Sequence, residues 1–385
     1  MPNVPPLNPP TVVYLDNNAT TACHPEVVAA MAPYWQTVYG NATSTHYAGR
    51  SAHRAIETAR GIIAETLAVQ PYQIFFNSGA TEGNNWIFHA FASTGNDKKR
   101  IVVSAIEHKS VLNAAKTLEA SGYDVIVLPV TPDGVVSVEA ARHAITSGTG
   151  LVSIQLANNE TGVLQPVQEL AAMAHTVGAF FHCDAVQGLG KMKLNLAELG
   201  VDSATVSGHK IHAPKGVGLL YLQSGSAQFP FPLPLQGGGQ EQGIRPGTLN
   251  VPGIVGMGKA FELFPNQQEV ARLRALQARL ENGLAATLPG CRVHGQAVLR
   301  LPNTTNISVP AIPSDILMAN LPMFCVSNGS ACDSGSLDAS YVLKAMGIPT
   351  EEARRSIRIS TSIQTAVFEI DSFVSQVFLK YEELK

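Results

Sequence analysis

The stretch SGHKIHAPKGVGLLYL, residues Ser207–Leu222, places a lysine between two short apolar runs. The runs Ala204–Val206 and Gly218–Leu222 predict a buried strand on each side of Lys210. Burial favours the neutral amine, which is the form that makes a Schiff base. An isolated lysine after a strand is more often an ordinary surface residue, so this interpretation depends on the motifs around it.

Apolar runs and amphipathic helical patterns alternate from about residue 70 to 222. The other predicted strands are Ile74–Phe76, Ile101–Val103, Val125–Leu128, Leu151–Leu156 and Ala179–Cys183. Helical patterns cover Gly49–Val69, Ser110–Ala120, Val136–Ile145 and Pro166–Val177. Strands that are apolar throughout and alternate with helices predict an α/β fold, in which a mostly parallel sheet lies between helices.

The pattern changes after a segment rich in Gly and Pro, residues 228–252, which predicts an irregular excursion. A long helix is expected from about Ile254 to Leu288, with a break near Pro265. Short strands then follow at Arg292–Val293, Asn306–Val309 and Phe324–Val326, with helices near Ser314–Asn320, Ser340–Met346 and Ala366–Lys380. We predict a large domain over 17–264 and a smaller α+β domain over 1–16 and 265–385, which carries a cysteine-containing loop at about 325–338.

Composition excludes several classes of protein. The 385 residues have a formal net charge of −3, which gives no strong signal for binding nucleic acid. The five cysteines form no CxxC pair, so neither a disulfide framework nor a metal site is predicted. The Pro-rich first ten residues lack a signal-peptide pattern, and no apolar run is long enough to span a membrane. A cytoplasmic protein without direct membrane binding is expected.

Polar side chains follow several of the predicted strands, where open α/β sheets bind their ligands. Asp184 ends one strand, and Gln187 lies three residues later. Pyridoxal phosphate (PLP) needs such an acid beside its ring nitrogen and a lysine such as Lys210. Ser207 and His209 could donate to its phosphate.

Three further strand ends fit the same ligand. In NSGATEGNN, Asn77–Asn85, small residues and the Thr81 hydroxyl could hold a phosphate at a helix N-terminus. His108 could stack on a flat ring, and Asn159 lies at another strand end. Each signal is weak alone, but polar groups at five strand ends are hard to explain by packing.

Ten motifs carry a resemblance to a known family. In chain order they are YLDNNATT, GNATSTH, NSGATEGNN, EHKSV, NNETGVLQP, CDAVQ, SGHKIHAPKGVG, GGGQEQGIRPGT, NGSACDSGS and SIRIS. They resemble the motifs of the NifS/IscS-type cysteine desulfurases, which belong to the class V, fold-type I, aminotransferase-like PLP enzymes. The resemblance extends from Val13 to about Glu369 and implies a homodimer.

The resemblance also implies residue roles. Lys210 would hold PLP, Asp184 would pair with the ring nitrogen, and His108 would stack on the ring and assist proton transfer. The remaining cofactor contacts would come from Gln187 and Asn159 by the ring hydroxyl, and from Ala80, Thr81, Ser207, His209 and the partner subunit's Thr248 at the phosphate. Arg358 would bind the substrate carboxylate as a bidentate fork, with Asn159 beside it.

Cys332 separates the possible functions. Small residues surround it in NGSACDSGS, which predicts a flexible loop, and a nucleophile that must enter a pocket and leave again suits such a loop. The resemblance places the catalytic cysteine of the desulfurases here. Asp333 departs from the Thr of many relatives, and its carboxylate would disfavour the thiolate. The other four cysteines are interpreted as structural.

The sequence therefore predicts a PLP-dependent cysteine desulfurase, which converts L-cysteine to L-alanine and leaves a persulfide on Cys332 for sulfur-acceptor proteins. The alternatives are an enzyme of the same fold that does not use Cys332, such as a selenocysteine lyase or an aminotransferase, and a non-catalytic scaffold that binds partners. The acceptor is not readable from the sequence, and iron–sulfur assembly, tRNA thiolation and DNA phosphorothioation are all compatible with it.

Overall fold

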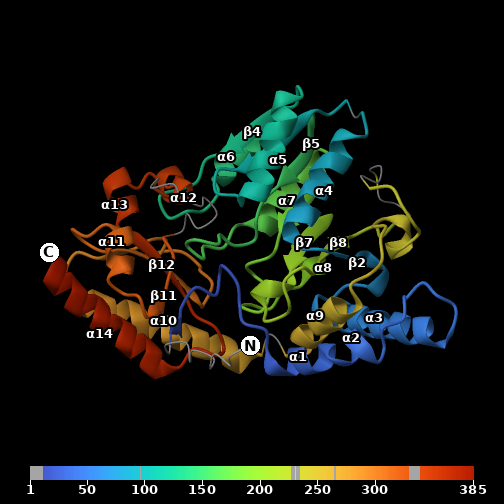
Figure 1. Ribbon diagram of the computed structural model, residues 1–385. Helices are drawn as coiled ribbons and strands as arrows, with labels where there is room; N and C mark the ends of the chain where they lie inside the picture. Colours follow the sequence, from blue (N-terminus) through green and yellow to red (C-terminus); the bar gives the residue numbers. More distant parts are fainter. Residues whose placement is uncertain (1–11, 96, 227–229, 231–234, 264–265, 329–338) are drawn as a thin grey trace, which may run out of the picture.

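A seven-stranded sheet forms the centre of the computed structural model, which describes residues 12–95, 97–226, 230, 235–263, 266–328 and 339–385 (Figure 1). Its order is β2-β8-β7-β6-β5-β3-β4. The bounds are β2 Ile74–Asn77, β3 Arg100–Ser104, β4 Asp124–Leu128, β5 Thr149–Ser153, β6 Phe180–Asp184, β7 Ser203–Ser207 and β8 Gly218–Leu222. Only β8 runs against the other six, since it pairs antiparallel with β2 and β7. The predicted α/β fold is confirmed.

Helices cover both faces of this sheet. One face packs on α4 (Ala80–Ala92) and α5 (Lys109–Ala120). The other packs on α1 (Pro25–Met31), α3 (Tyr47–Thr66), α6 (Val138–Ala144), α7 (Val167–Thr176), α8 (Leu196–Leu199) and α9 (Val251–Leu263). Neighbouring strand residues therefore enter different cores, which is why the strands are apolar throughout: Phe75 faces α4, and Phe76 faces α3.

The C-terminal part surrounds a separate core (Figure 1). Its helices are α10 (Gln267–Thr287), α11 (Ser314–Ala319), α12 (Tyr341–Ala345), α13 (Thr350–Arg354) and α14 (Val367–Leu384). Its strands are β9 (Arg292–Val293), β10 (Thr304–Ser308) and β12 (Ser356–Ser360) in one sheet, and β1 (Val13–Tyr14) beside β11 (Phe324–Cys325) in another. Four short helices complete the described elements: α2 (Pro33–Gln36), η1 (Pro71–Gln73), η2 (Gly208–Lys210) and η3 (Glu241–Gly243).

Each strand and helix that was expected in this part is present within a few residues of its predicted bounds. The predicted break in the long helix is confirmed, because α9 ends at Leu263 and Asn266 caps α10. β12 was not predicted as a strand. Its two isoleucines alternate with Ser and Arg and so form no continuous apolar run, although all five of its residues are buried. The domain limits at 17–264 and 265–385 stay a prediction.

The segment Asp16–Thr21 joins the two parts. The Asn18 backbone N–H donates to Ser360 Oγ at 2.9 Å, and its Nδ2 donates to Thr304 Oγ1 at 2.8 Å. The Thr21 backbone N–H donates to the His209 carbonyl at 2.8 Å. This segment therefore fixes the C-terminal sheet against the end of β7, where the polar residues gather.

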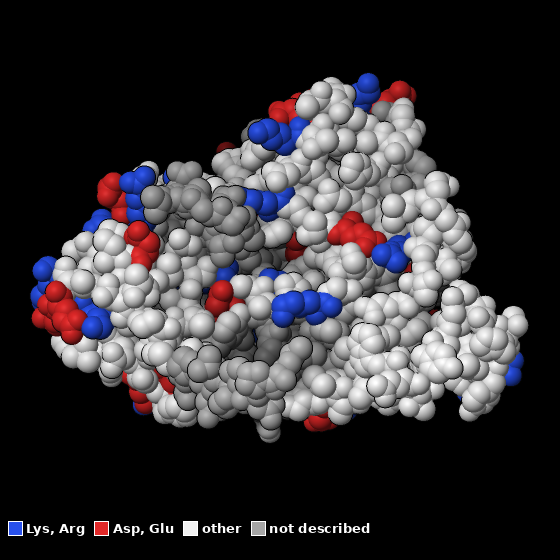
Figure 2. Space-filling model, viewed as in Figure 1, with Lys and Arg blue, Asp and Glu red and all other residues white. Residues whose placement is uncertain are grey.

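The surface gives two further findings. On the face drawn in Figure 2, the described acidic and basic side chains are interspersed, in keeping with the net charge of −3. Among the described helices, none combines the length and the apolar character that a membrane crossing needs.

Candidate active site

A cavity of about 600 Å³ lies at the carboxyl ends of the parallel strands. Ten of the predicted site residues line it: Ala80, Thr81, His108, Asn159, Asp184, Gln187, Ser207, His209, Lys210 and Arg358. Thr248 is exposed and lies outside this lining. Cys332 lies outside the described residues.

Lys210 lies in the short helix η2, directly after β7. Its Nζ donates to the backbone carbonyls of Asn18 at 2.6 Å and Ala19 at 2.8 Å. The amine is therefore held at the cavity wall by the segment that joins the two parts of the chain. The sequence offered YLDNNATT only as a family motif, and its contact with Lys210 depends on the tertiary structure.

Asp184 is the last residue of β6 and is buried. Its Oδ2 accepts from Asn84 Nδ2 at 2.8 Å, and its Oδ1 accepts from the Val186 backbone N–H at 3.1 Å. Two donors thus fix the plane of this carboxylate, which faces the same cavity as Lys210. Sequence analysis missed Asn84, which gave no signal beyond its place in NSGATEGNN.

The N-terminus of α4 forms a cradle for an anion. Its N-cap Gly79 has φ 145°, a conformation that favours glycine, and no described side chain caps this end of the helix. The first-turn N–H groups, including those of Ala80 and Thr81, are thus open to a ligand. A Cβ at Gly79 would lie 3.6 Å from Ser207 Oγ, an ordinary contact distance, so it is the positive φ that requires glycine here.

His209 lies beside this cradle and is neutral. Burial lowers its pKa to about 4, and the nearby charges of Lys210 and Lys215 act in the same direction. Its Nδ1 lies 3.1 Å from Thr20 Oγ1. A neutral imidazole has a single N–H that can donate to an anion. His209 would therefore bind an anion through one directed hydrogen bond and not through an ion pair.

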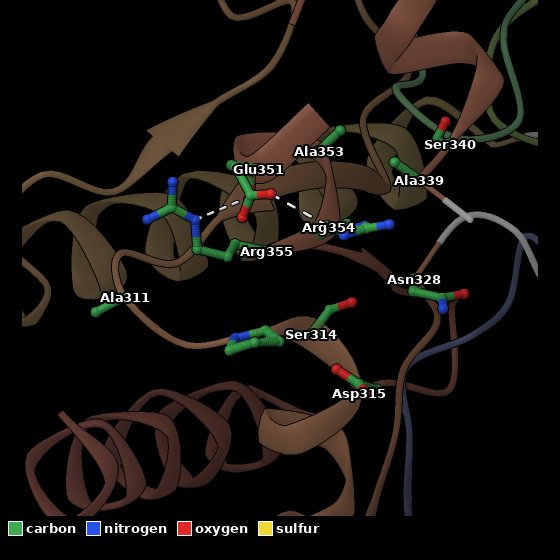
Figure 3. Close-up of a pocket in the computed structure, with 11 residues that line it drawn as sticks. Ala311, Ser314, Asp315, Asn328, Ala339, Ser340, Glu351, Ala353, Arg354 and Arg355 are labelled. Atoms are coloured by element: carbon green, nitrogen blue, oxygen red, sulfur yellow. Dashed lines mark hydrogen bonds and ion pairs between the residues drawn. The ribbon is translucent and has the colours of Figure 1, made fainter. Parts of the chain in front are cut away.

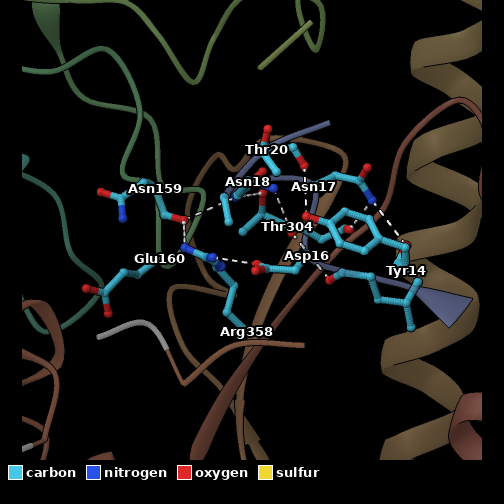
Figure 4. Close-up of polar contacts among 12 residues, drawn as sticks. Tyr14, Asp16, Asn17, Asn18, Thr20, Asn159, Glu160, Thr304 and Arg358 are labelled. Atoms are coloured by element: carbon cyan, nitrogen blue, oxygen red, sulfur yellow. Dashed lines mark hydrogen bonds and ion pairs between the residues drawn. The ribbon is translucent and has the colours of Figure 1, made fainter. Parts of the chain in front are cut away.

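Arg358 enters the cavity from β12 (Figure 4). One terminal nitrogen donates to Asp16 Oδ1 at 2.6 Å, and the other donates to the Asn159 carbonyl at 3.1 Å. Its Nε is buried and has no hydrogen-bond partner among the described residues, and the same holds for Asn159 Oδ1. Buried polar atoms without partners at a cavity wall indicate where a polar ligand binds.

Lys191 is a buried lysine that sequence analysis missed. Its Nζ donates to Gln187 Oε1 at 2.6 Å and to Asn18 Oδ1 at 3.1 Å. Burial lowers its pKa well below the usual value, and the charges of Lys210 and Arg358 add to this effect. Because the Lys191 amine holds the Gln187 side-chain oxygen and the Gln187 amide nitrogen donates to the Asn18 carbonyl at 3.1 Å, one hydrogen of that nitrogen is left for another acceptor.

Two buried acids lie behind the cavity. Burial raises the pKa of Glu107 to about 8, and the Asp184 charge adds to the shift. Burial raises the pKa of Glu160 to about 7, although Ser340 donates to it at 2.5 Å. Glu107 is buried directly before His108, which lines the cavity, so the protonation state of Glu107 affects the folding stability of this part of the cavity wall.

Glu107→Gln should make folding stability less sensitive to a rise in pH from about 5.5 to 8. A carboxyl whose folded pKa is raised stabilises the fold at low pH, and this contribution is lost as the pH rises through the folded value. Between about pH 5.5 and 8 the Glu107 carboxyl alone should cost about 3 kcal/mol of unfolding free energy in the wild type. Urea denaturation across this window measures the difference. The exposed Glu119→Gln should follow the wild type, and identical pH slopes for all three proteins would contradict the assignment.

A second cavity of about 520 Å³ lies in the C-terminal part (Figure 3). Asn328 and Ala339, the residues on either side of 329–338, line it together with Asp315, Glu351 and Arg354. Glu351 lies 4.0 Å from Arg354, so the charges around this cavity largely compensate each other. Its lining suggests no catalytic chemistry.

Comparisons with known proteins agree with this geometry. The family model described as "Aminotransferase class-V" matches residues 13–373. The chain is 44% identical to "Cysteine desulfurase 2" of Trichormus variabilis over 94% of its length and 91% of that protein. The solved structure of a "NIFS-like protein" is 37% identical and superposes with a TM-score of 0.89. The match covers 97% of the present chain and 100% of the chain in that structure. A second solved structure, "SspA in complex with cysteine", is 33% identical and superposes with a TM-score of 0.82. This match covers 92% of the present chain and 100% of the chain in that structure.

Proposed function

The chain belongs to the class V aminotransferase family and is a PLP-dependent cysteine desulfurase of the NifS/IscS type, and we propose that it transfers the sulfur of L-cysteine to Cys332. The observation that carries the proposal is the convergence of Lys210, Asp184 and Arg358 on one cavity of about 600 Å³. An amine, a fixed carboxylate and a guanidinium in one cavity suit an amino-acid substrate and a pyridine cofactor.

The residues present fit PLP. The open N–H groups at the start of α4 fit its phosphate, with Ser207 and His209 beside them. The Asp184 carboxylate fits a protonated ring nitrogen, and the Gln187 amide nitrogen fits the ring hydroxyl. When bound, PLP supplies a ring that accepts the electrons released as the substrate Cα loses its proton.

Each residue then has a separate task. Arg358 binds the substrate carboxylate through its fork, for which the buried Nε without a partner is available. Lys210 takes the proton from Cα once substrate has displaced its amine from the cofactor, and the carbonyls of Asn18 and Ala19 can hold the freed amine at the wall. His108 moves a second proton near the reacting sulfur.

The sulfur step conserves atoms and electrons. The Cys332 thiolate bonds to the substrate sulfur as the bond between that sulfur and Cβ breaks, and the electron pair stays on the substrate carbon. Protonation of this carbon gives L-alanine, and Cys332 holds a persulfide. No external oxidant is needed, because the substrate carbon takes the electrons that the two sulfurs give up.

We further propose a homodimer in which the partner subunit's Thr248 completes the phosphate site. Support comes from the exposure of Thr248 and its place outside the cavity of its own chain. Gel filtration that shows only monomers would count against this placement. The persulfide would pass to acceptor proteins, and the cytoplasm would keep the thiol of Cys332 reduced.

The test compares wild type with Cys332→Ser. With L-cysteine and a reductant, the wild type should give equal amounts of sulfide and alanine, and the variant should give neither. Cys291→Ser, at a partly buried cysteine, is the matched control and should keep full activity. Sulfide formation that persists in Cys332→Ser would favour a lyase that bypasses this thiol. Absence of turnover in the wild type would favour a scaffold.

A further inference from the structure

Asn84 is a fully buried amide in α4 whose polar atoms all have partners. Its Nδ2 donates to Asp184 Oδ2 at 2.8 Å and to Ser110 Oγ at 2.9 Å. Its Oδ1 lies 2.9 Å from His182 Nε2. One side chain on α4 thus contacts the end of β6 and the start of α5, and Asp184 at the end of β6 and His108 at the N-cap of α5 both line the cavity.

Close helix packing makes these contacts possible. Gly83 precedes Asn84, and a Cβ at Gly83 would lie 2.9 Å from the Thr205 side chain of β7. Real Cβ atoms keep a larger distance, so any other residue would push α4 away from the sheet. The glycine lets the helix approach until the Asn84 amide reaches Asp184.

The direction of each hydrogen bond follows from Asp184. A carboxylate only accepts, so the amide nitrogen of Asn84 must face Asp184 and its oxygen must face His182. His182 Nε2 must therefore carry a proton. Burial lowers the pKa of His182 to about 3, so this ring is neutral and its Nδ1 accepts from Ser203 Oγ at 2.8 Å.

The other hydrogen of the Asn84 amide orients the hydroxyl of Ser110, which is one of two donors to the His108 ring. Ser110 Oγ accepts from Asn84, so its own hydrogen is free to go to His108 Nδ1, 2.8 Å away. The Ser110 backbone N–H donates to the same Nδ1 at 3.1 Å. A nitrogen that accepts both hydrogens carries none, so the proton of a neutral His108 ring is on Nε2.

We propose that Asn84 is a positioning residue that couples the two groups next to the cofactor ring, because its amide fixes the Asp184 carboxylate and orients the Ser110 hydroxyl, which joins the Ser110 backbone N–H in keeping the proton of His108 on Nε2. In this state His108 begins the reaction as a proton donor. The inference rests on the proposed function, which gives Asp184 and His108 their roles at the ring.

The test uses holoenzyme and a matched pair of variants, Asn84→Ala and Asn85→Ala. Asn85 is the next residue of α4, and its Nδ2 donates to the Thr81 carbonyl on the exposed side of the helix. Asn84→Ala should lower kcat for L-cysteine by about 10- to 100-fold with KM within about threefold, a loss typical of outer hydrogen-bond partners of a site. It should also shift the pH midpoint of the cofactor's visible absorbance and speed cofactor loss on dialysis. Asn85→Ala should match the wild type in all three measurements.

Ser110→Ala separates the two branches and covers the case in which Asn84→Ala does not fold. It removes only the link to His108, so it should lower kcat and shift its pH profile while the cofactor absorbance midpoint stays at the wild-type value. A folded Asn84→Ala with wild-type kcat and midpoint, or a Ser110→Ala with a wild-type pH profile, would overturn the inference. A wild-type enzyme that makes no alanine would instead overturn the proposed function.

Discussion

Lys210→Ala should lower the rate of alanine formation from L-cysteine by at least about 10³-fold, because it removes both the covalent anchor of the cofactor and the base that takes the Cα proton. Its amine is held by the carbonyls of Asn18 and Ala19, so no other described lysine occupies that position. Lys191 cannot replace it, since its amine is committed to Gln187 and Asn18. Alanine release under saturating L-cysteine measures the effect.

The controls for Lys210→Ala test the cofactor separately from turnover. After borohydride reduction and denaturation, the wild type should keep its cofactor covalently bound and the variant should release it. Lys193→Ala, at an exposed lysine, should behave as wild type in both assays. Covalent cofactor in Lys210→Ala would show that another lysine carries it and would contradict the assignment.

Arg358→Lys should raise KM for L-cysteine by about 10- to 100-fold and change kcat much less. An ammonium group cannot reproduce the bidentate fork, and one charge-assisted hydrogen bond contributes about 1.5–3 kcal/mol. The guanidinium also holds Asp16 at 2.6 Å, a bond that a lysine is too short to keep together with the substrate contact. Initial rates over a range of L-cysteine concentrations separate the two constants.

Cysteamine, which lacks the carboxylate, provides the specificity control for Arg358. The wild type should discriminate strongly against cysteamine, and Arg358→Lys should lose most of that discrimination because only the carboxylate contact differs. Arg354→Lys, an exposed arginine of α13, should leave both substrates unaffected. Equal discrimination by wild type and Arg358→Lys would place the carboxylate elsewhere.

Local patterns in the sequence were enough to predict the strands of the sheet and most of the residues that line the cavity. All seven strands were predicted because a strand covered by helices on both faces must be apolar on both sides, as Phe75 and Phe76 are. Apart from Arg358, which lies inside β12, the predicted cavity residues lie at or shortly after the ends of strands of this sheet, and parallel strands end at the same edge of a sheet. Their convergence on one cavity could therefore be expected before any coordinates were known.

The tertiary structure alone decided the contacts between distant segments. Asn18 lies 192 residues from Lys210, and Asn84 lies 100 residues from Asp184; neither pairing leaves a mark in local periodicity. The sequence by itself determined the α/β fold and the chemical groups at the strand ends, because apolar runs, their alternation with helical patterns and the residues that follow them are local features of the sequence. Which backbone holds the Lys210 amine, which amide orients Asp184 and how Lys191 is buried depend on packing between elements, and packing exists only in the folded chain.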